Sequence, residues 1–259
     1  MKVLILAGGF GTRLGEETAI RPKPMVTVGD QPILWHIMKI YSYYGFNDFV
    51  ILAGYKQEVI KDYFFNYILH NSDVNFDLAN NNYRFFNSKV EPWNVSVIFT
   101  GDDSLTGTRI KKAQQYVGNE PFMLTYGDGV SDVNISKLVE YHKSTKSLCT
   151  LTAYQPKGRF GAISIDKNGK VNSFEEKPVG SSSWINSGFF VCEPEVFDYI
   201  PNDINTVFEQ EPLMELAKAG KLGAFKHEGF WHPMDMLKDK VELNALWRLN
   251  KAPWKVWKS

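Results

Sequence analysis

A glycine-rich stretch near the N-terminus, Leu6-Ala7-Gly8-Gly9-Phe10-Gly11-Thr12-Arg13-Leu14, constrains this chain more than any other. It follows an apolar run over residues 3–7 that is typical of a buried strand. Because glycine lacks a Cβ atom, such a backbone can bend sharply and bring its N–H groups against a ligand. The simplest chemical interpretation is a loop that wraps phosphates, with Arg13 supplying positive charge. The alternative is a tight strand-to-helix turn without a ligand, since a lone glycine-rich loop is a weak signal.

The chain alternates strand and helix patterns through its first 155 residues or so. Apolar runs at residues 3–7, 49–53, 95–99, 122–126 and 148–154 predict strands, and segments 33–44, 57–69, 106–117 and 135–146 have helical spacing. This alternation predicts an α/β fold of Rossmann type, with a mainly parallel mixed sheet and helices on both faces. Without a linker or repeat, residues 1–259 are expected to form a single domain.

Two segments break the alternation. Residues 70–94 combine asparagines with scattered aromatic side chains, which predicts an inserted excursion of short strands and a candidate subunit contact. After residue 156 the pattern becomes richer in strands. A hairpin is expected over residues 160–175, a strand over 185–192, and helices over 208–219 and 238–249. Residues 156–259 are therefore treated as a smaller, β-rich C-terminal portion.

The charge balance argues against partners that need a strongly charged protein. Lys plus Arg equals Asp plus Glu at 29 each, so no global charge favours nucleic acid or an acidic membrane. No apolar stretch approaches the roughly 20 residues that span a bilayer, and the N-terminal run is too short for a signal peptide. Cys149 and Cys192 lack metal-ligand spacing and fit a reducing compartment. A cytoplasmic protein is the expectation.

Charged residues follow or flank the predicted strands where ligands of an open α/β sheet bind. Asp128 lies between Gly127 and Gly129 after the fourth predicted strand, and Lys23 lies between two prolines that keep its backbone extended. A carboxylate near a phosphate loop suggests Mg²⁺, which prefers one or two carboxylates with phosphate oxygens. Each residue has a plain alternative: Asp128 in a turn, Asp235 capping the last helix, and Lys23 or Lys177 as surface charges. The combination favours phosphoryl-type transfer, which needs positioning and charge neutralisation.

Taken together, the motifs resemble one family over nearly the whole chain. LAGGFGTRL, RPKPM, YGDG, EEKP, INSGFF and a late aspartate are similar to the sugar-1-phosphate nucleotidylyltransferases. Within that family, VEPWNV, TGDDSLTGTRIKKA, FEQEPLMELA and GFWHPMD are most similar to members that use CTP and glucose 1-phosphate. The resemblance implies that an oxygen of the sugar phosphate attacks the α-phosphorus of CTP in line, giving CDP-glucose and pyrophosphate.

The resemblance also implies a role for individual residues. It gives catalytic roles to Arg13 and Lys23 and a Mg²⁺ site to Asp128 and Asp235. The nucleotide side would comprise Leu6, Ala7, Gly8, Gly9, Phe10, Gly11, Thr12, Arg13, Lys23, Ser104, Arg109 and Gly127, with Ser104 and Arg109 meeting the base. The sugar-phosphate side would comprise Gly161, Glu176, Lys177, Asn186 and Gly188.

The family resemblance further suggests a homohexamer that supplies lipopolysaccharide O-antigen synthesis. Three alternatives stay open at this point. One is a thymidylyl- or uridylyltransferase on the same scaffold, and another is a nucleotide-binding regulatory subunit without catalysis. The weakest is a dinucleotide-binding dehydrogenase, which would need GxGxxG and an acidic residue after the second strand.

Overall fold

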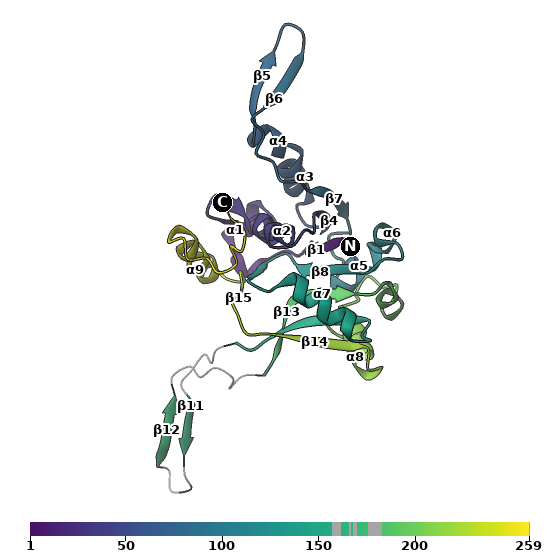
Figure 1. Cartoon of the computed structure of the whole chain (residues 1–259), viewed down its shortest axis with the longest axis vertical. Helices are drawn as coiled ribbons and strands as arrows, with labels where there is room; N and C mark the ends of the chain where they lie inside the picture. The colour runs from purple at the N-terminus through teal and green to yellow at the C-terminus, as the bar shows by residue number, and fades with distance from the viewer. Residues whose placement is uncertain (157–161, 166, 168–169, 176–182, 259) are drawn as a thin grey trace.

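The centre of the protein is a seven-stranded mixed sheet with the order β14-β10-β13-β8-β1-β4-β7 (Figure 1). The structure is a computed structural model that describes residues 1–156, 162–165, 167, 170–175 and 183–258. The sheet strands are β1 (Val3–Ala7), β4 (Asp48–Ala53), β7 (Asn94–Phe99), β8 (Phe122–Tyr126), β10 (Cys149–Tyr154), β13 (Ile185–Cys192) and β14 (Leu222–His227). β1 pairs in parallel with both β4 and β8, whereas β13 is antiparallel to β8 and β10. The predicted mainly parallel mixed sheet is confirmed.

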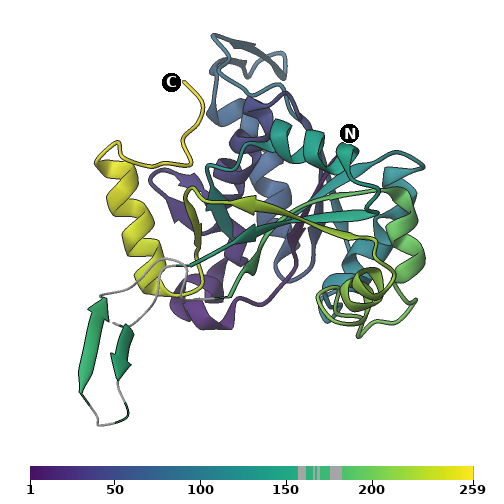
Figure 2. The ribbon, with the colours of Figure 1, turned by 60° about the horizontal axis from the view of Figure 1, so that its bottom comes forward.

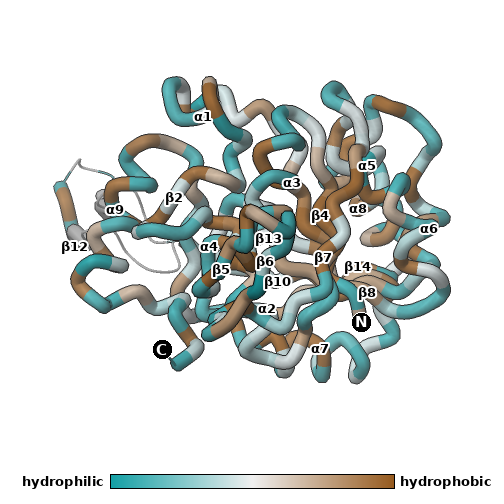
Figure 3. Tube along the Cα trace, turned by 90° about the horizontal axis from the view of Figure 1, so that it is seen from above, coloured by the Kyte–Doolittle hydropathy of each residue, from teal (hydrophilic) through white to brown (hydrophobic). Residues whose placement is uncertain are grey.

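Helices cover both faces of the sheet (Figure 2). One face packs against α2 (Ile33–Tyr43), α3 (Gln57–Phe65), α7 (Ile135–Ser144) and α9 (Leu237–Arg248), and the other against α5 (Thr106–Lys112), α6 (Gln114–Val117) and α8 (Glu211–Lys218). Successive side chains of a strand point to opposite faces, so Val3 and Ile5 enter the first core and Leu4 the second. Burial on both faces explains why the central strands β1 and β4 are almost continuously apolar. Brown segments lie near the centre of Figure 3, where β4 is labelled.

Two predicted helices are each broken in two. The segment expected over residues 57–69 ends at Phe65 and restarts as α4 (Tyr67–His70). At the break, the backbone N–H and the side-chain amide of Asn66 both donate to the Asp62 carbonyl, at 3.0 and 2.9 Å. The segment expected over 106–117 divides at Ala113 into α5 and α6. Among the described residues, no helix combines the length and apolarity that crossing a bilayer requires.

Short elements complete the chain. Two hairpins extend from the body at opposite ends of Figure 1: β5 (Asp73–Asp77) with β6 (Asn82–Phe86), and β11 (Ala162–Ile165) with β12 (Val171–Glu175). Small sheets join β2 (Thr27–Val28) to β3 (Gln31–Pro32) and β9 (Gly129–Ser131) to β15 (Trp231–Pro233). The remaining helical turns are η1 (Thr12–Leu14), α1 (Glu16–Ile20), η2 (Lys23–Met25) and η3 (Pro194–Tyr199).

The C-terminal segment is anchored on α2 by a buried histidine. His36 is fully buried, its Nε2 lies 2.9 Å from the Val28 carbonyl oxygen, and Trp254 Nε1 donates to His36 Nδ1 at 3.3 Å. The carbonyl needs a donor and the indole needs an acceptor, so the two contacts together require neutral imidazole with its proton on Nε2. Trp254 itself is fully buried beside Trp247.

Candidate active site

A cavity of about 550 Å³ opens at the carboxyl ends of β1 and β8. The chain passes from β1 to β4 and β7 on one side and returns to β8 on the other, so the strand order reverses between β1 and β8. That reversal is where open α/β sheets bind their ligands. The predicted residues that line the cavity are Leu6, Ala7, Gly8, Gly9, Gly11, Thr12, Arg13, Lys23, Ser104, Arg109, Gly127, Asp128, Asn186, Gly188 and Asp235.

The other predicted site residues lie elsewhere or are not described. Phe10 is 47% exposed, and its ring packs against Tyr55 with 5.2 Å between centroids. Gly161, Glu176 and Lys177 lie outside the residues that the structure describes.

Arg109 binds the backbone of the glycine-rich loop. Its Nη2 donates to the carbonyl oxygens of Gly8 at 2.9 Å and Asp102 at 3.0 Å. Its Nη1 donates to the Gly101 carbonyl at 2.7 Å and to Thr100 Oγ1 at 2.6 Å. Both terminal nitrogens are therefore engaged by the protein itself, and the guanidinium joins the loop after β1 to the loop after β7.

The packing around Arg109 explains why residue 8 is glycine. A Cβ atom on Gly8 would lie 2.1 Å from Arg109 Nη1, closer than any real contact. Arg109 is only 4% exposed, and this burial lowers its pKa, although the negative charges of Asp102 and Asp103 oppose the shift. Because a guanidinium titrates far above neutral pH, Arg109 keeps its charge and its donors.

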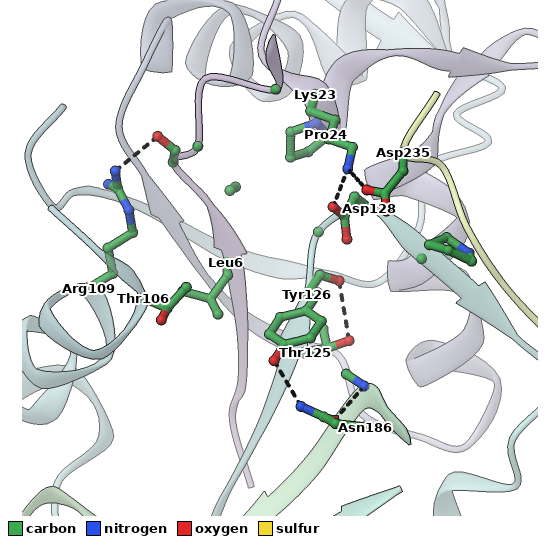
Figure 4. Close-up of a pocket in the computed structure, with 18 of the residues that line it drawn as sticks. Leu6, Lys23, Pro24, Thr106, Arg109, Thr125, Tyr126, Asp128, Asn186 and Asp235 are labelled. Carbon is green, nitrogen blue, oxygen red and sulfur yellow. Dashed lines mark hydrogen bonds and ion pairs between the residues drawn. The ribbon is translucent and has the colours of Figure 1, made fainter. Parts of the chain in front are cut away.

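Lys23 lies between two carboxylates that come from distant parts of the sequence (Figure 4). Its ammonium contacts Asp128 Oδ2 at 2.5 Å and Asp235 Oδ1 at 2.6 Å, and its side chain is 11% exposed. The surface-lysine interpretation of Lys23 is therefore wrong. Asp128 is carried by the turn between β8 and β9, and Asp235 follows β15, so the pairing of β9 with β15 brings the two aspartates together.

The charges at this centre support one another. Burial lowers the pKa of Lys23, but the charges and hydrogen bonds of Asp128 and Asp235 outweigh it, so the pKa lies above its usual value. Burial raises the pKa of Asp235, but the Lys23 hydrogen bond and charge, with Arg13, bring it below its ordinary value. Asp235 and Lys23 are thus held ionised around neutral pH.

Asp235 does not cap the last helix. Met236 is the residue at the start of α9, and the Asp239 carboxylate accepts hydrogen bonds from the backbone N–H groups of Asp235 at 2.9 Å and Met236 at 2.8 Å. The capping interpretation of Asp235 is wrong, and its carboxylate is available to the cavity. Arg13, whose side chain is 70% exposed, contacts Asp235 Oδ2 at 3.2 Å from the rim.

The pair of aspartates fits a divalent cation. Both carboxylates contact one ammonium, so their oxygens lie within about 5 Å of each other. The two side chains are 31% and 29% exposed, which leaves them open to hydrated ions and to phosphate oxygens. Two carboxylates are the donor set that Mg²⁺ prefers when phosphates supply further ligands.

The opposite wall of the cavity contains residues that the sequence patterns did not single out. The hydroxyl of Tyr126 donates to Glu209 Oε1 at 2.6 Å and accepts from Asn186 Nδ2 at 2.9 Å. A Cβ atom on Gly188 would lie 2.2 Å from the Tyr126 ring, so this glycine makes room for the tyrosine. Tyr126 lies in the YGDG motif and Glu209 in the FEQEP motif, but neither motif predicts that the two side chains are hydrogen-bonded.

Both the fold and the site define a nucleotidyltransferase. The chain belongs to the nucleotidyl transferase family, whose sequence profile matches residues 2–234. Among curated proteins, it is 56% identical over 258 residues to the glucose-1-phosphate cytidylyltransferase of Salmonella typhimurium, covering 99% of this chain and all of that relative.

Solved structures share the fold. HddC from Yersinia pseudotuberculosis has a TM-score of 0.69 at 25% identity, covering 95% of this chain and 99% of HddC. A UDP-glucose pyrophosphorylase complexed with UDP-glucose also has a TM-score of 0.69, at 17% identity, covering 96% of this chain and 98% of that one. At this low identity the second likeness concerns the fold alone.

Proposed function

We propose that this protein transfers a cytidylyl group from CTP to α-D-glucose 1-phosphate, giving CDP-glucose and pyrophosphate. The observation that carries the proposal is the 56% identity to a glucose-1-phosphate cytidylyltransferase along that relative's full length. The cavity suits the chemistry, because a glycine-rich loop, a largely buried lysine and two aspartates line it where the strand order reverses between β1 and β8. No covalent attack by the protein is needed for such a transfer.

In the proposed mechanism, an oxygen of the sugar phosphate forms a bond to the α-phosphorus of CTP while the bond to pyrophosphate breaks. Lys23 neutralises charge that develops on the nucleotide phosphates, and Arg13 at the rim stabilises the departing pyrophosphate. Both side chains already contact Asp235, so the cationic groups are oriented before substrate binds. Orientation of this kind lowers the barrier without any reorganisation during the reaction.

Asp128 and Asp235 would hold Mg²⁺, which supplies neutralisation of the two phosphate groups when bound. The residues themselves contribute the fixed negative charge and its placement beside Lys23. The backbone N–H groups of the glycine-rich loop would contact the nucleotide phosphates.

The base would be read on the side of Ser104 and Arg109. Ser104 is buried, and its hydroxyl donates to the Thr100 carbonyl at 2.6 Å. The terminal nitrogens of Arg109 also bind backbone carbonyls, those of Gly8 and Gly101. We therefore propose that Ser104 and Arg109 hold the loops after β1 and β7, and that these loops face the base. On the other wall, Asn186 and Gly188, with Gly161, Glu176 and Lys177, would receive glucose 1-phosphate.

We further propose that the enzyme is a cytoplasmic homo-oligomer, with a hexamer as the expected state. The β5–β6 hairpin supports an interface role because large apolar side chains on it face solvent, including Phe76, Leu78 and Tyr83 at 55%, 87% and 63% exposure. Deletion of residues 72–90 should reduce the sedimentation coefficient to that of a smaller assembly. Unchanged sedimentation and activity would contradict this role for the hairpin.

One experiment tests the proposed reaction directly. Pyrophosphate release is measured for each of the four ribonucleotides and dTTP with glucose 1-phosphate and Mg²⁺. We expect CTP to be used at least tenfold faster than UTP or dTTP, a difference of about 1.4 kcal/mol on the rate scale. Preference for dTTP or UTP would establish the alternative thymidylyl or uridylyl activity. Binding of nucleotide without pyrophosphate release would point to a regulatory subunit.

A further inference from the structure

The carboxylate of Glu209 joins the two walls of the cavity. Oε1 accepts a hydrogen bond from the Tyr126 hydroxyl and Oε2 accepts one from Thr106 Oγ1, each at 2.6 Å. Tyr126 ends β8, and Thr106 is the first residue of α5. The half-buried Glu209 side chain therefore links α5 to β8, two elements that are not consecutive in the chain.

On one side the network reaches the sugar wall. The Tyr126 hydroxyl accepts from Asn186 Nδ2 at 2.9 Å, and Asn186 Oδ1 accepts from the Gly188 backbone N–H at 2.9 Å. Figure 4 shows the Tyr126 hydroxyl beside the Asn186 amide. Glu209 binds the same hydroxyl, so its carboxylate helps to fix the hydroxyl and, through it, the direction of the Asn186 amide. Burial raises the pKa of Tyr126, and the Glu209 charge raises it further, so the phenol stays a donor.

On the other side the network reaches the nucleotide wall. Thr106 Oγ1 also accepts from the Phe208 backbone N–H at 2.9 Å, so residues 208 and 209 add to the backbone bonds that hold the start of α5 to residues 204 and 206. One turn later the same helix carries Arg109, which binds the Gly8 carbonyl at 2.9 Å. A shift of the start of α5 would therefore move the clamp on the glycine-rich loop.

We propose that Glu209 is a positioning residue that aligns the sugar subsite with the nucleotide subsite. This inference rests on the proposed function, because it takes Asn186 as a sugar contact and the Gly8 loop as a nucleotide contact. The physical reason is that a carboxylate offers two acceptor oxygens, one for each wall. A carboxamide has one acceptor oxygen and a donor amide, so it can satisfy Tyr126 or Thr106 but not both in the same arrangement.

Three variants test the two sides of the network separately: the sugar side through Tyr126 and the nucleotide side through Thr106. We expect Tyr126→Phe to raise KM for glucose 1-phosphate about tenfold and to leave KM for CTP within threefold. Thr106→Val should raise KM for CTP about tenfold and leave that for glucose 1-phosphate within threefold. Glu209→Gln should raise both and lower kcat. The double variant Tyr126→Phe/Glu209→Gln should have the same KM for glucose 1-phosphate as Glu209→Gln alone, because both changes break one connection.

Glu211→Gln is the matched control, since Glu211 is exposed two residues further along the chain. The inference is overturned if Glu209→Gln changes neither KM more than Glu211→Gln does, or if the double variant shows additive losses. A lower Tm with both KM values unchanged would also overturn it, because that is the result of a purely structural role.

Failure of the proposed function would look different. A wild-type protein that releases no pyrophosphate with CTP but does so with another nucleotide contradicts the proposed function, and the variants are then measured with that nucleotide. If no nucleotide is used, the Kd for glucose 1-phosphate is measured by calorimetry in wild type and in Tyr126→Phe. This comparison still tests whether the Tyr126 hydroxyl positions the sugar subsite. A tenfold weaker Kd supports the inference, and an equal Kd overturns it.

Discussion

The stability of this protein should depend on pH through His36, which contacts neither predicted substrate side. Burial lowers the pKa of His36 to about 4, from an ordinary value of 6.5, although the hydrogen bond to Val28 opposes the shift. Below pH 6.5 the unfolded chain takes up a proton on this imidazole and the folded chain does not. Folding stability is therefore lost as the pH falls from 6.5 to 4, and it is not affected by His36 above that range.

The size of the effect follows from the two pKa values. A difference of about 2.5 units, at 1.36 kcal/mol each, corresponds to roughly 3 kcal/mol once the pH is below 4. At pH 5 the linkage relation gives a loss of about 2 kcal/mol relative to pH 7. The structure gives the reason: a second ring proton on Nδ1 would face the Trp254 indole N–H at 3.3 Å, donor against donor.

The assay is urea unfolding followed by tryptophan fluorescence at pH 7 and pH 5. His36→Gln keeps a donor for the Val28 carbonyl and cannot titrate, so its stability should fall by about 2 kcal/mol less than that of wild type between the two pH values. The exposed His70 is the control, and His70→Gln should retain the wild-type pH dependence. Equal pH dependence in wild type and His36→Gln would refute the assignment of a neutral buried imidazole.

Four other substitutions test the site. Lys23→Ala should lower kcat about a hundredfold or more, since the lysine supplies charge; turnover within about threefold of wild type would be inconsistent with that role. Asp235→Asn should raise the Mg²⁺ concentration needed for half-maximal rate, and an unchanged metal titration would remove Asp235 from the metal site. Arg109→Ala should weaken CTP more than glucose 1-phosphate, whereas equal losses would indicate a general structural role. Gly8→Ala should lower Tm by roughly 2–10 °C because its Cβ atom would meet the Arg109 guanidinium, while Gly9→Ala, with no atom within 4 Å of its Cβ, should not.

The role of Arg109 changes most between sequence and structure. The resemblance to cytidylyl-transferring relatives implies that Arg109 meets the base, where a guanidinium suits the cytosine carbonyl oxygen. In the folded protein its terminal nitrogens bind the carbonyls of Gly8, Gly101 and Asp102. Nothing in the local sequence distinguishes these two uses of a guanidinium, because the carbonyls come from segments that are distant along the chain.

The sequence by itself determined the fold class and the position of the glycine-rich loop after β1. Continuous apolar strands alternating with amphipathic helices are a local pattern, and a strand buried on both faces must be apolar at every position. The run from Leu6 to Leu14 is likewise local, because glycine acts through its own backbone. Two helix breaks, at Asn66 and Ala113, escaped prediction because the ends of elements are the part of a fold that sequence patterns specify least.

Only the tertiary structure decided which charged groups meet. Lys23 contacts aspartates 105 and 212 positions away, and the pairing of β9 with β15 decides whether it is a solvated surface lysine or one bonded to two carboxylates. Glu209, just before α8, likewise reaches Tyr126 at the end of β8, 83 positions earlier. Electrostatic and hydrogen-bond energies depend on distances of a few ångströms, and the order of residues along the chain does not specify those distances.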